Sequence, residues 1–118
     1  MKILIVDDSP LLRTILRDYL LEAGHEVFEA GTCAEAGDRF QRFHPEVVFK
    51  DLFMPEWDAI ESIRFFKKLN DQVKIVICST NSAKITILEA LKAGAHDFLL
   101  KPLDKNQVLS TLKRLAIS

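Results

Sequence analysis

Apolar residues recur along the chain in two alternating patterns, short continuous runs and longer stretches with helical spacing. The run Lys2–Val6 is apolar and rich in β-branched residues, which is typical of a strand buried on both faces. Ser9 and Pro10 then suit the N-cap and first turn of a helix, whose apolar positions recur at three- and four-residue intervals. Gly24 stands where that helix is expected to end.

The same unit of strand and helix recurs to the end of the chain. The later predicted strands are Glu26–Ala30, Glu46–Lys50, Val73–Cys78 and His96–Leu100. The second predicted helix is Thr32–Phe43, and Asp58 caps the third. The fourth is capped by Asn81 or Ser82 and ends near Ala93, and Asp104 caps the fifth. Parallel strands need long right-handed crossovers, so this alternation predicts a parallel sheet with helices on both faces. We expect one α/β domain over residues 1–118, with a doubly wound five-stranded parallel sheet and five helices.

Composition and charge narrow the function. Apolar residues make up 48% of the chain and charged residues 28%, which is typical of a globular domain. The net charge is −1, and without a basic excess we expect no direct binding to nucleic acid and no membrane-surface helix. The apolar run at the amino end is too short for a signal peptide or a membrane span, so a cytoplasmic location is predicted. The three histidines are scattered near predicted element boundaries.

Polar side chains gather where the predicted strands end, and parallel strands bring those ends to one edge of the sheet. Asp7 and Asp8 follow the first strand, Asp51 the third, Ser79 the fourth and Lys101 the fifth. Taken singly, such residues are explained by helix capping, by turns or by solvation. Three converging carboxylates would however repel one another, and a bound cation relieves the repulsion. The site would offer few protein ligands, and all of them are hard oxygen atoms. This set suits Mg²⁺, which keeps several of its waters when it binds a protein.

The remaining groups at this edge suit phosphoryl transfer to a carboxylate. Lys101 supplies a positive charge, and the Ser79 hydroxyl supplies a hydrogen-bond donor. In such a transfer the protein positions the reactants and neutralises charge. Asp51 is the natural acceptor because it stands alone on the central strand, whereas Asp7 and Asp8 form a pair.

The residue pairs and motifs at these strand ends, in order, resemble the response-regulator receiver domain of two-component signalling, in its chemotaxis-type single-domain form. The resemblance is carried by Asp7-Asp8, by Asp51 within DLFMPEWD, by Ser79 and by AGAHDFLLKP, and it covers essentially the whole chain. No single motif is decisive, but the ordered set is highly specific. The resemblance implies a flavodoxin-like sheet with strand order 2-1-3-4-5.

The resemblance also implies a phosphoacceptor site. Asp51 would take a phosphoryl group from a phosphohistidine of a sensor histidine kinase or phosphotransfer protein. Asp8 would ligate Mg²⁺ directly and Asp7 through water, and Asp51 and the backbone carbonyl of Phe53 would complete the protein ligands. The chain would then be a signalling phosphoacceptor that assists its own phosphorylation and dephosphorylation, not an enzyme with a separate substrate.

Further roles follow from the same resemblance. Ser79 and Lys101 would contact the phosphoryl oxygens, and the bond between Lys101 and Pro102 would be cis. Phe98 falls where the family has an aromatic whose rotamer couples to the hydroxyl of Ser79. The fourth helix, fifth strand and fifth helix would form the surface that binds a downstream effector protein, with the chain a monomer or a weak dimer.

Four positions depart from the family pattern or tune it. Ala59 replaces the usual glycine after Asp58 and fits a helix start. Phe53 and Asn81 stand at positions that tune phosphate loss, and a phenyl ring at 53 is expected to exclude the attacking water. Lys50 stands where an apolar or small residue is usual. Its ammonium either reaches the acidic cluster and competes with Mg²⁺ or, as we expect, extends along one sheet face to water.

Three alternative functions fit the sequence less well than a phosphoacceptor. A phosphorylation-independent pseudo-receiver, acting as a docking module, is suggested only by Lys50. A phosphatase with an aspartate nucleophile needs a general acid two residues after it, where Phe53 stands. A flavodoxin-like carrier of FMN needs a phosphate-cradling loop after the first strand, where Asp7 and Asp8 would repel the phosphate.

Overall fold

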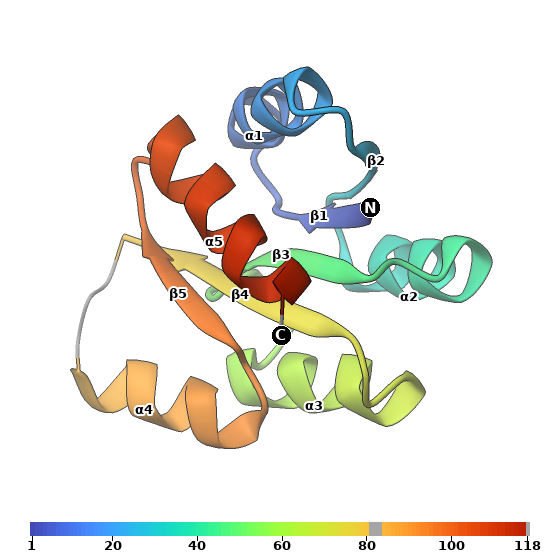
Figure 1. Ribbon diagram of the computed structural model, residues 1–118. Coiled ribbons are helices and arrows are strands. Elements are labelled where there is room, and N and C mark those ends of the chain that lie inside the picture. The colour runs from blue at the N-terminus through green and yellow to red at the C-terminus, as the bar shows by residue number, and fades with distance from the viewer. Residues whose placement is uncertain (81–83, 118) are drawn as a thin grey trace.

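The computed structural model describes residues 1–80 and 84–117, in which strands and helices alternate (Figure 1). The strands are β1 (Lys2–Val6), β2 (Glu26–Ala30), β3 (Val47–Asp51), β4 (Lys74–Ser79) and β5 (Asp97–Leu100), and the helices are α1 (Pro10–Glu22), α2 (Cys33–Phe43), α3 (Ala59–Leu69), α4 (Lys84–Ala93) and α5 (Lys105–Ile117). All strand pairs are parallel, in the order β2-β1-β3-β4-β5. The predicted doubly wound α/β fold and its strand order are confirmed.

The helices cover both faces of the sheet and divide the core in two. On one face, α1 and α5 pack on the sheet through Leu16, Leu20, Val108 and Leu112. On the other face, α2, α3 and α4 contribute residues that include Phe40, Ile63, Phe66 and Ala90. Figure 1 shows α1 and α5 above the sheet and α3 and α4 below it. Both faces of β1, β3 and β4 are therefore buried, which explains their continuous apolar runs.

The register of the sheet aligns the carboxyl ends of the inner strands. Val6 lies opposite Lys50, and Asp51 lies opposite Cys78. Ser79 in turn lies opposite Leu100. The residues that follow these pairs must emerge at the same edge, so the fold itself assembles the predicted polar groups.

Side-chain caps define where the helices begin. The hydroxyl of Ser9 accepts a hydrogen bond from the Leu12 amide, and the carboxylate of Asp58 accepts one from the Glu61 amide. Asp104 caps α5 in the same way, so these three predicted helix starts are confirmed. Asn81 and Ser82, the predicted caps of α4, lie outside the described residues. None of the helices within residues 1–80 and 84–117 is long and apolar enough to cross a membrane.

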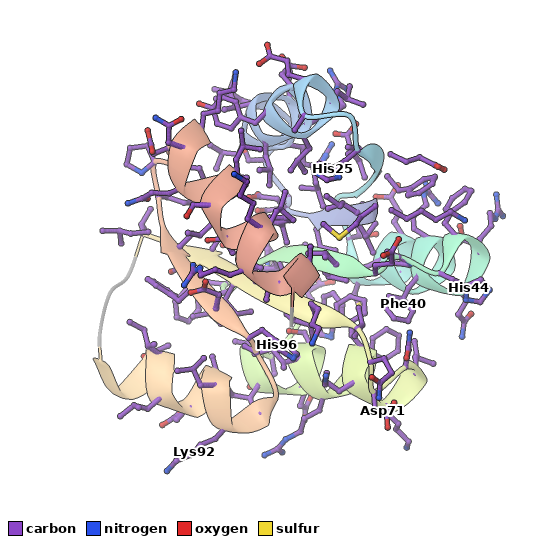
Figure 2. The ribbon with its side chains drawn as sticks, viewed as in Figure 1. His25, Phe40, His44, Asp71, Lys92 and His96 are labelled. Carbon is purple, nitrogen blue, oxygen red and sulfur yellow. The ribbon has the colours of Figure 1, made fainter. Side chains whose placement is uncertain are left out.

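The boundaries of the third, fourth and fifth strands differ from the prediction by one residue. The third and fourth strands begin and end one residue later than expected, so Asp51 and Ser79 are the last residues of β3 and β4. The histidines lie apart from one another at element boundaries, as predicted (Figure 2). His44 is the left-handed C-cap of α2 with φ 52°, and His25 and His96 come just before β2 and β5.

Candidate functional site

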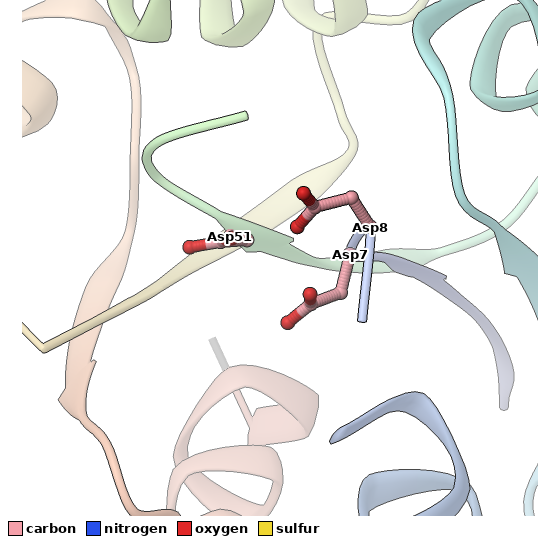
Figure 3. Close-up of side chains that lie close together, drawn as sticks. All are labelled: Asp7, Asp8 and Asp51. Atoms are coloured by element: carbon pink, nitrogen blue, oxygen red, sulfur yellow. The ribbon is translucent and has the colours of Figure 1, made fainter. Parts of the chain in front are cut away.

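Three carboxylates meet at the carboxyl edge of the sheet. Asp7 and Asp8 follow β1 and Asp51 ends β3, and one oxygen of each lies within 4.8 Å of the others. Figure 3 shows the three side chains around this edge. Asp7 is buried, Asp51 half-buried and Asp8 exposed. Hard oxygen donors at this spacing, open to solvent on one side, fit a Mg²⁺ ion that keeps several waters.

Lys101 lies among these carboxylates. Its Nζ is 2.9 Å from Oδ2 of Asp7 and 3.4 Å from Oδ1 of Asp51. The Lys101 amide donates to the carbonyl of Ser79 at 2.8 Å, which holds the ends of β4 and β5 together. The peptide bond between Lys101 and Pro102 is cis, as predicted. The structure thus brings Lys101 and the buried Ser79 to the acidic edge alongside the aspartates.

Burial and neighbouring charges together shift the pKa values at this edge. Burial raises the pKa of Asp51, and the charge and hydrogen bond of Lys101 lower it by less. Burial would lower the pKa of Lys101, but its hydrogen bond to Asp7 and the charges of Asp51 and Asp7 outweigh burial and raise it. A cation bound beside Asp51 would oppose the effect of burial and favour the charged carboxylate.

Lys50 does not extend to water, so our expectation for its side chain was wrong. The residue is 0% exposed, because the helices on its face of the sheet and the ring of Trp57 enclose it. Its Nζ donates to the backbone carbonyl of Asp51 at 2.6 Å and lies 5.0 Å from the centroid of the Trp57 ring. The ammonium therefore lies against the backbone of the acceptor residue.

Burial also changes the chemistry of Lys50. It lowers the pKa of Lys50 to about 8, and the negative charges of Asp51 and Asp7 partly oppose that change. The side chain is therefore still mainly an ammonium at pH 7. The ammonium contacts the backbone of Asp51, and among the described residues Lys50 forms no ion pair with the three carboxylates. Its competition with Mg²⁺ stays a prediction.

The residues expected to tune or report phosphorylation differ in their exposure and packing. Phe53 is 53% exposed beside the site, and its backbone amide donates to the Asp51 carboxylate. Phe98 is half-buried and packs against the core beneath α2, α3 and α4. Asn81 lies outside the described residues.

Two residues near the site were missed by the sequence analysis. One is Trp57, whose ring lies against the ammonium of Lys50. Nothing in the sequence around Trp57 indicated this contact. Arg13 is the other: its guanidinium donates to the backbone carbonyl of Asp7 at 2.6 Å and pairs with Glu29. It also fills the space that a side chain at Gly31 would need, since a Cβ there would lie 2.8 Å from Nη1. Arg17 also pairs with Glu29, and no local sequence pattern indicates the contact of Arg13 with Asp7.

Comparison with known proteins identifies the family. The family model for the response regulator receiver domain matches residues 3–113. The chain is 35% identical over 116 residues to the chemotaxis protein CheY of Thermotoga maritima, covering 98% of this chain and 97% of that one. It is 34% identical over 114 residues to CheY of Bacillus subtilis, covering 96% and 95%. The crystallised chemotaxis protein CheY4 of Vibrio cholerae superposes with a TM-score of 0.91 at 28% identity, covering 97% of each chain. The chain therefore belongs to the response regulator receiver domain family, and it is a receiver of the chemotaxis type.

Proposed function

We propose that this phosphoacceptor response regulator takes its phosphoryl group from the phosphohistidine of a sensor histidine kinase or phosphotransfer protein, in a Mg²⁺-dependent transfer to Asp51. One observation carries the proposal. The carboxylate that ends the central strand lies within 4.8 Å of two further carboxylates and 3.4 Å from the ammonium of Lys101. A helix cap or a turn aspartate needs neither contact. Phosphoryl transfer to a carboxylate needs both an acidic metal site and a fixed positive charge.

The metal would be held by this chain's own oxygens. Asp8 and Asp51 would be direct ligands together with the carbonyl of Phe53, and Asp7 would act through water. Bound there, Mg²⁺ supplies charge neutralisation for the phosphoryl oxygens. The oxygen-only donor set supports this metal over zinc, which favours nitrogen and sulfur ligands.

In the transfer, a carboxylate oxygen of Asp51 attacks phosphorus and forms an acyl phosphate. The phosphorus–nitrogen bond of the donor breaks, and its electron pair stays with the leaving imidazole nitrogen. The ammonium of Lys101 and the hydroxyl of Ser79 contact the phosphoryl oxygens and stabilise their charge. The sheet keeps the acceptor in place, because the amide of the next residue, Leu52, donates to the Cys78 carbonyl at 2.9 Å.

Phosphorylation would be read out at the surface of α4, β5 and α5 by a downstream effector protein. Contact of the phosphoryl group with Ser79 would be coupled to the side chain of Phe98 on β5, which shifts a pre-existing equilibrium between two surface conformations. Exposed Leu88, Leu91 and Leu100 on α4 and β5 provide apolar contacts for a partner. We place this activity in the cytoplasm, in a single receiver domain over residues 1–118 that is a monomer or weak dimer.

The proposal is tested by mixing the protein with Mg²⁺ and acetyl phosphate and measuring its intact mass. We expect a mass gain of one phosphoryl group that is lost in Asp51→Asn and on chelation of the metal. Asp71→Asn, at an exposed aspartate beyond α3, is the matched control and should label like the wild type. Labelling that persists in Asp51→Asn would place the acceptor elsewhere.

The same experiment separates the alternative. Absence of labelling together with normal folding would indicate a phosphorylation-independent docking module. The buried ammonium of Lys50 would then be the first residue to replace, since it is the chain's departure from the family pattern beside the acceptor.

A further inference from the structure

Lys50 and Trp57 form a contact that the phosphoacceptor chemistry does not require. The side chain of Lys50 leaves β3 on the same face as Val48 and Leu52, beneath α2, α3 and α4, while Asp51 points to the edge. Its ammonium is held on one side by the carbonyl of Asp51 and on the other by the ring of Trp57. A cation over the face of an indole ring is attracted by the ring's quadrupole. These two contacts and the burial of the side chain hold the ammonium beside the backbone of Asp51.

This fixed charge changes the balance at the acidic edge. The three carboxylates and Lys101 alone would carry a formal charge of −2, and Lys50 reduces it to −1. Among the described residues, the ion pairs with the clustered carboxylates are made by Lys101. Lys50 lies behind the strand and is bonded to a backbone carbonyl. It therefore leaves the carboxylate oxygens accessible to a metal while repelling the metal's charge through the protein.

We propose that Lys50 tunes the metal affinity of the acidic site: its ammonium, held between the Asp51 carbonyl and the Trp57 ring, lowers the affinity of the three carboxylates for a divalent cation. The inference rests on the proposed function, since it concerns the same Mg²⁺ site. Its consequence is that half-filling of the site needs a higher Mg²⁺ concentration than it would without this ammonium. Trp57, the only tryptophan, touches the ammonium and so reports on filling of the site.

The test is a titration with Mg²⁺ alone at pH 7, followed by calorimetry and by the fluorescence of Trp57. The variants are Lys50→Met, which removes the charge, and Lys50→Arg, which keeps it. Lys67→Met is the matched control, because Lys67 also donates to backbone carbonyls, those of Asp71 and Val73, away from the acidic edge. Circular dichroism checks folding, and Lys50→Gln replaces the methionine variant if that one does not fold.

We expect Lys50→Met to bind Mg²⁺ roughly tenfold more tightly than the wild type. Lys67→Met should bind Mg²⁺ with the affinity of the wild type, and Lys50→Arg should bind it more weakly than Lys50→Met does. The fluorescence change on adding Mg²⁺ should be present in the wild type and much smaller in Lys50→Met, although calorimetry still detects binding there.

Two results would overturn the inference, and they are distinguishable from each other. If the wild type binds Mg²⁺ and Lys50→Met binds it equally or more weakly, the inference fails and the proposed function stands. If neither protein binds Mg²⁺, both the inference and the metal requirement of the proposed function fail. Labelling by acetyl phosphate, measured separately, then decides whether Asp51 still accepts a phosphoryl group.

Discussion

Two lysines lie near the acceptor Asp51, and their pKa values shift in opposite directions although burial lowers both. Lys101 reaches the carboxylates directly, and its pKa is raised because its bond to Asp7 and the charges around it outweigh burial. Lys50 lies behind the strand against a carbonyl and an indole ring, and burial lowers its pKa to about 8. Both are part of one electrostatic site. The difference shows that the partner within reach of the ammonium, not burial alone, decides whether a buried lysine stabilises the fold.

The largest difference between the two lysines should appear in the free energy of unfolding when each is replaced by methionine. Lys101→Met removes the partner of the buried carboxylate of Asp7 and leaves three clustered negative charges. Without metal, we expect the free energy of unfolding to fall by about 3 kcal/mol, since breaking a buried ion pair leaves an uncompensated charge. Denaturant unfolding in the presence of a chelator measures it. Lys105→Met, which removes an exposed pair with Glu22, is the control and should change stability by less than about 1 kcal/mol.

The pH dependence of stability should distinguish Lys50 from an ordinary lysine. The folded-state pKa of about 8 lies below the ordinary value of 10.5. As the pH rises from 8 to 10.5, the folded state loses this proton first, so the unfolded state binds more protons and stability rises. Relative to Lys50→Met, the wild type should gain up to roughly 3 kcal/mol across this window.

Unfolding of both proteins in a chelator, at intervals across that pH range, gives the difference directly. Groups that titrate in both proteins cancel in the comparison. Parallel curves would mean that Lys50 keeps an ordinary pKa in the folded protein, and the contrast with Lys101 would then be lost.

At pH 7 the same substitution should stabilise the metal-free protein. Methionine fills a similar volume without the penalty of burying a charge, although the carbonyl of Asp51 loses its hydrogen bond. We expect Lys50→Met to raise the free energy of unfolding by roughly 2 kcal/mol, the opposite sign to Lys101→Met. A loss of stability in denaturant unfolding would show that the contacts with the carbonyl and with Trp57 outweigh the desolvation of the ammonium.

The two lysines also show which features of the structure could be predicted from the sequence and which could not. Strand and helix patterns, with caps at Ser9, Asp58 and Asp104, were enough to predict the alternation of elements. The parallel sheet then brought Asp7 and Asp51 to one edge, because the ends of parallel strands must meet there. These predictions succeeded because each rests on backbone geometry.

The path of a single long side chain was not predictable in this way. Lys50 has enough rotatable bonds to reach either water or the site, and the choice depends on whether Trp57 and the helices close its face of the sheet. That closure is a tertiary contact between a strand and a loop, and no local period records it. The guanidinium of Arg13 against the Asp7 carbonyl was missed for the same reason.

The smallest effect we expect concerns Phe53, on the solvent side of the acceptor. Its ring is 53% exposed beside Asp51, where it would shield the acyl phosphate from an attacking water. Phe53→Asn should speed phosphate loss several-fold, on the order of 1 kcal/mol in the barrier.

The rate is measured on phosphorylated protein from which acetyl phosphate has been removed, by following its intact mass over time. Phe53→Leu keeps an apolar side chain and should stay near the wild type. Equal rates for phenylalanine and asparagine would show that water reaches phosphorus by a path that the ring does not cover, and the lifetime would then depend on the charges around the site.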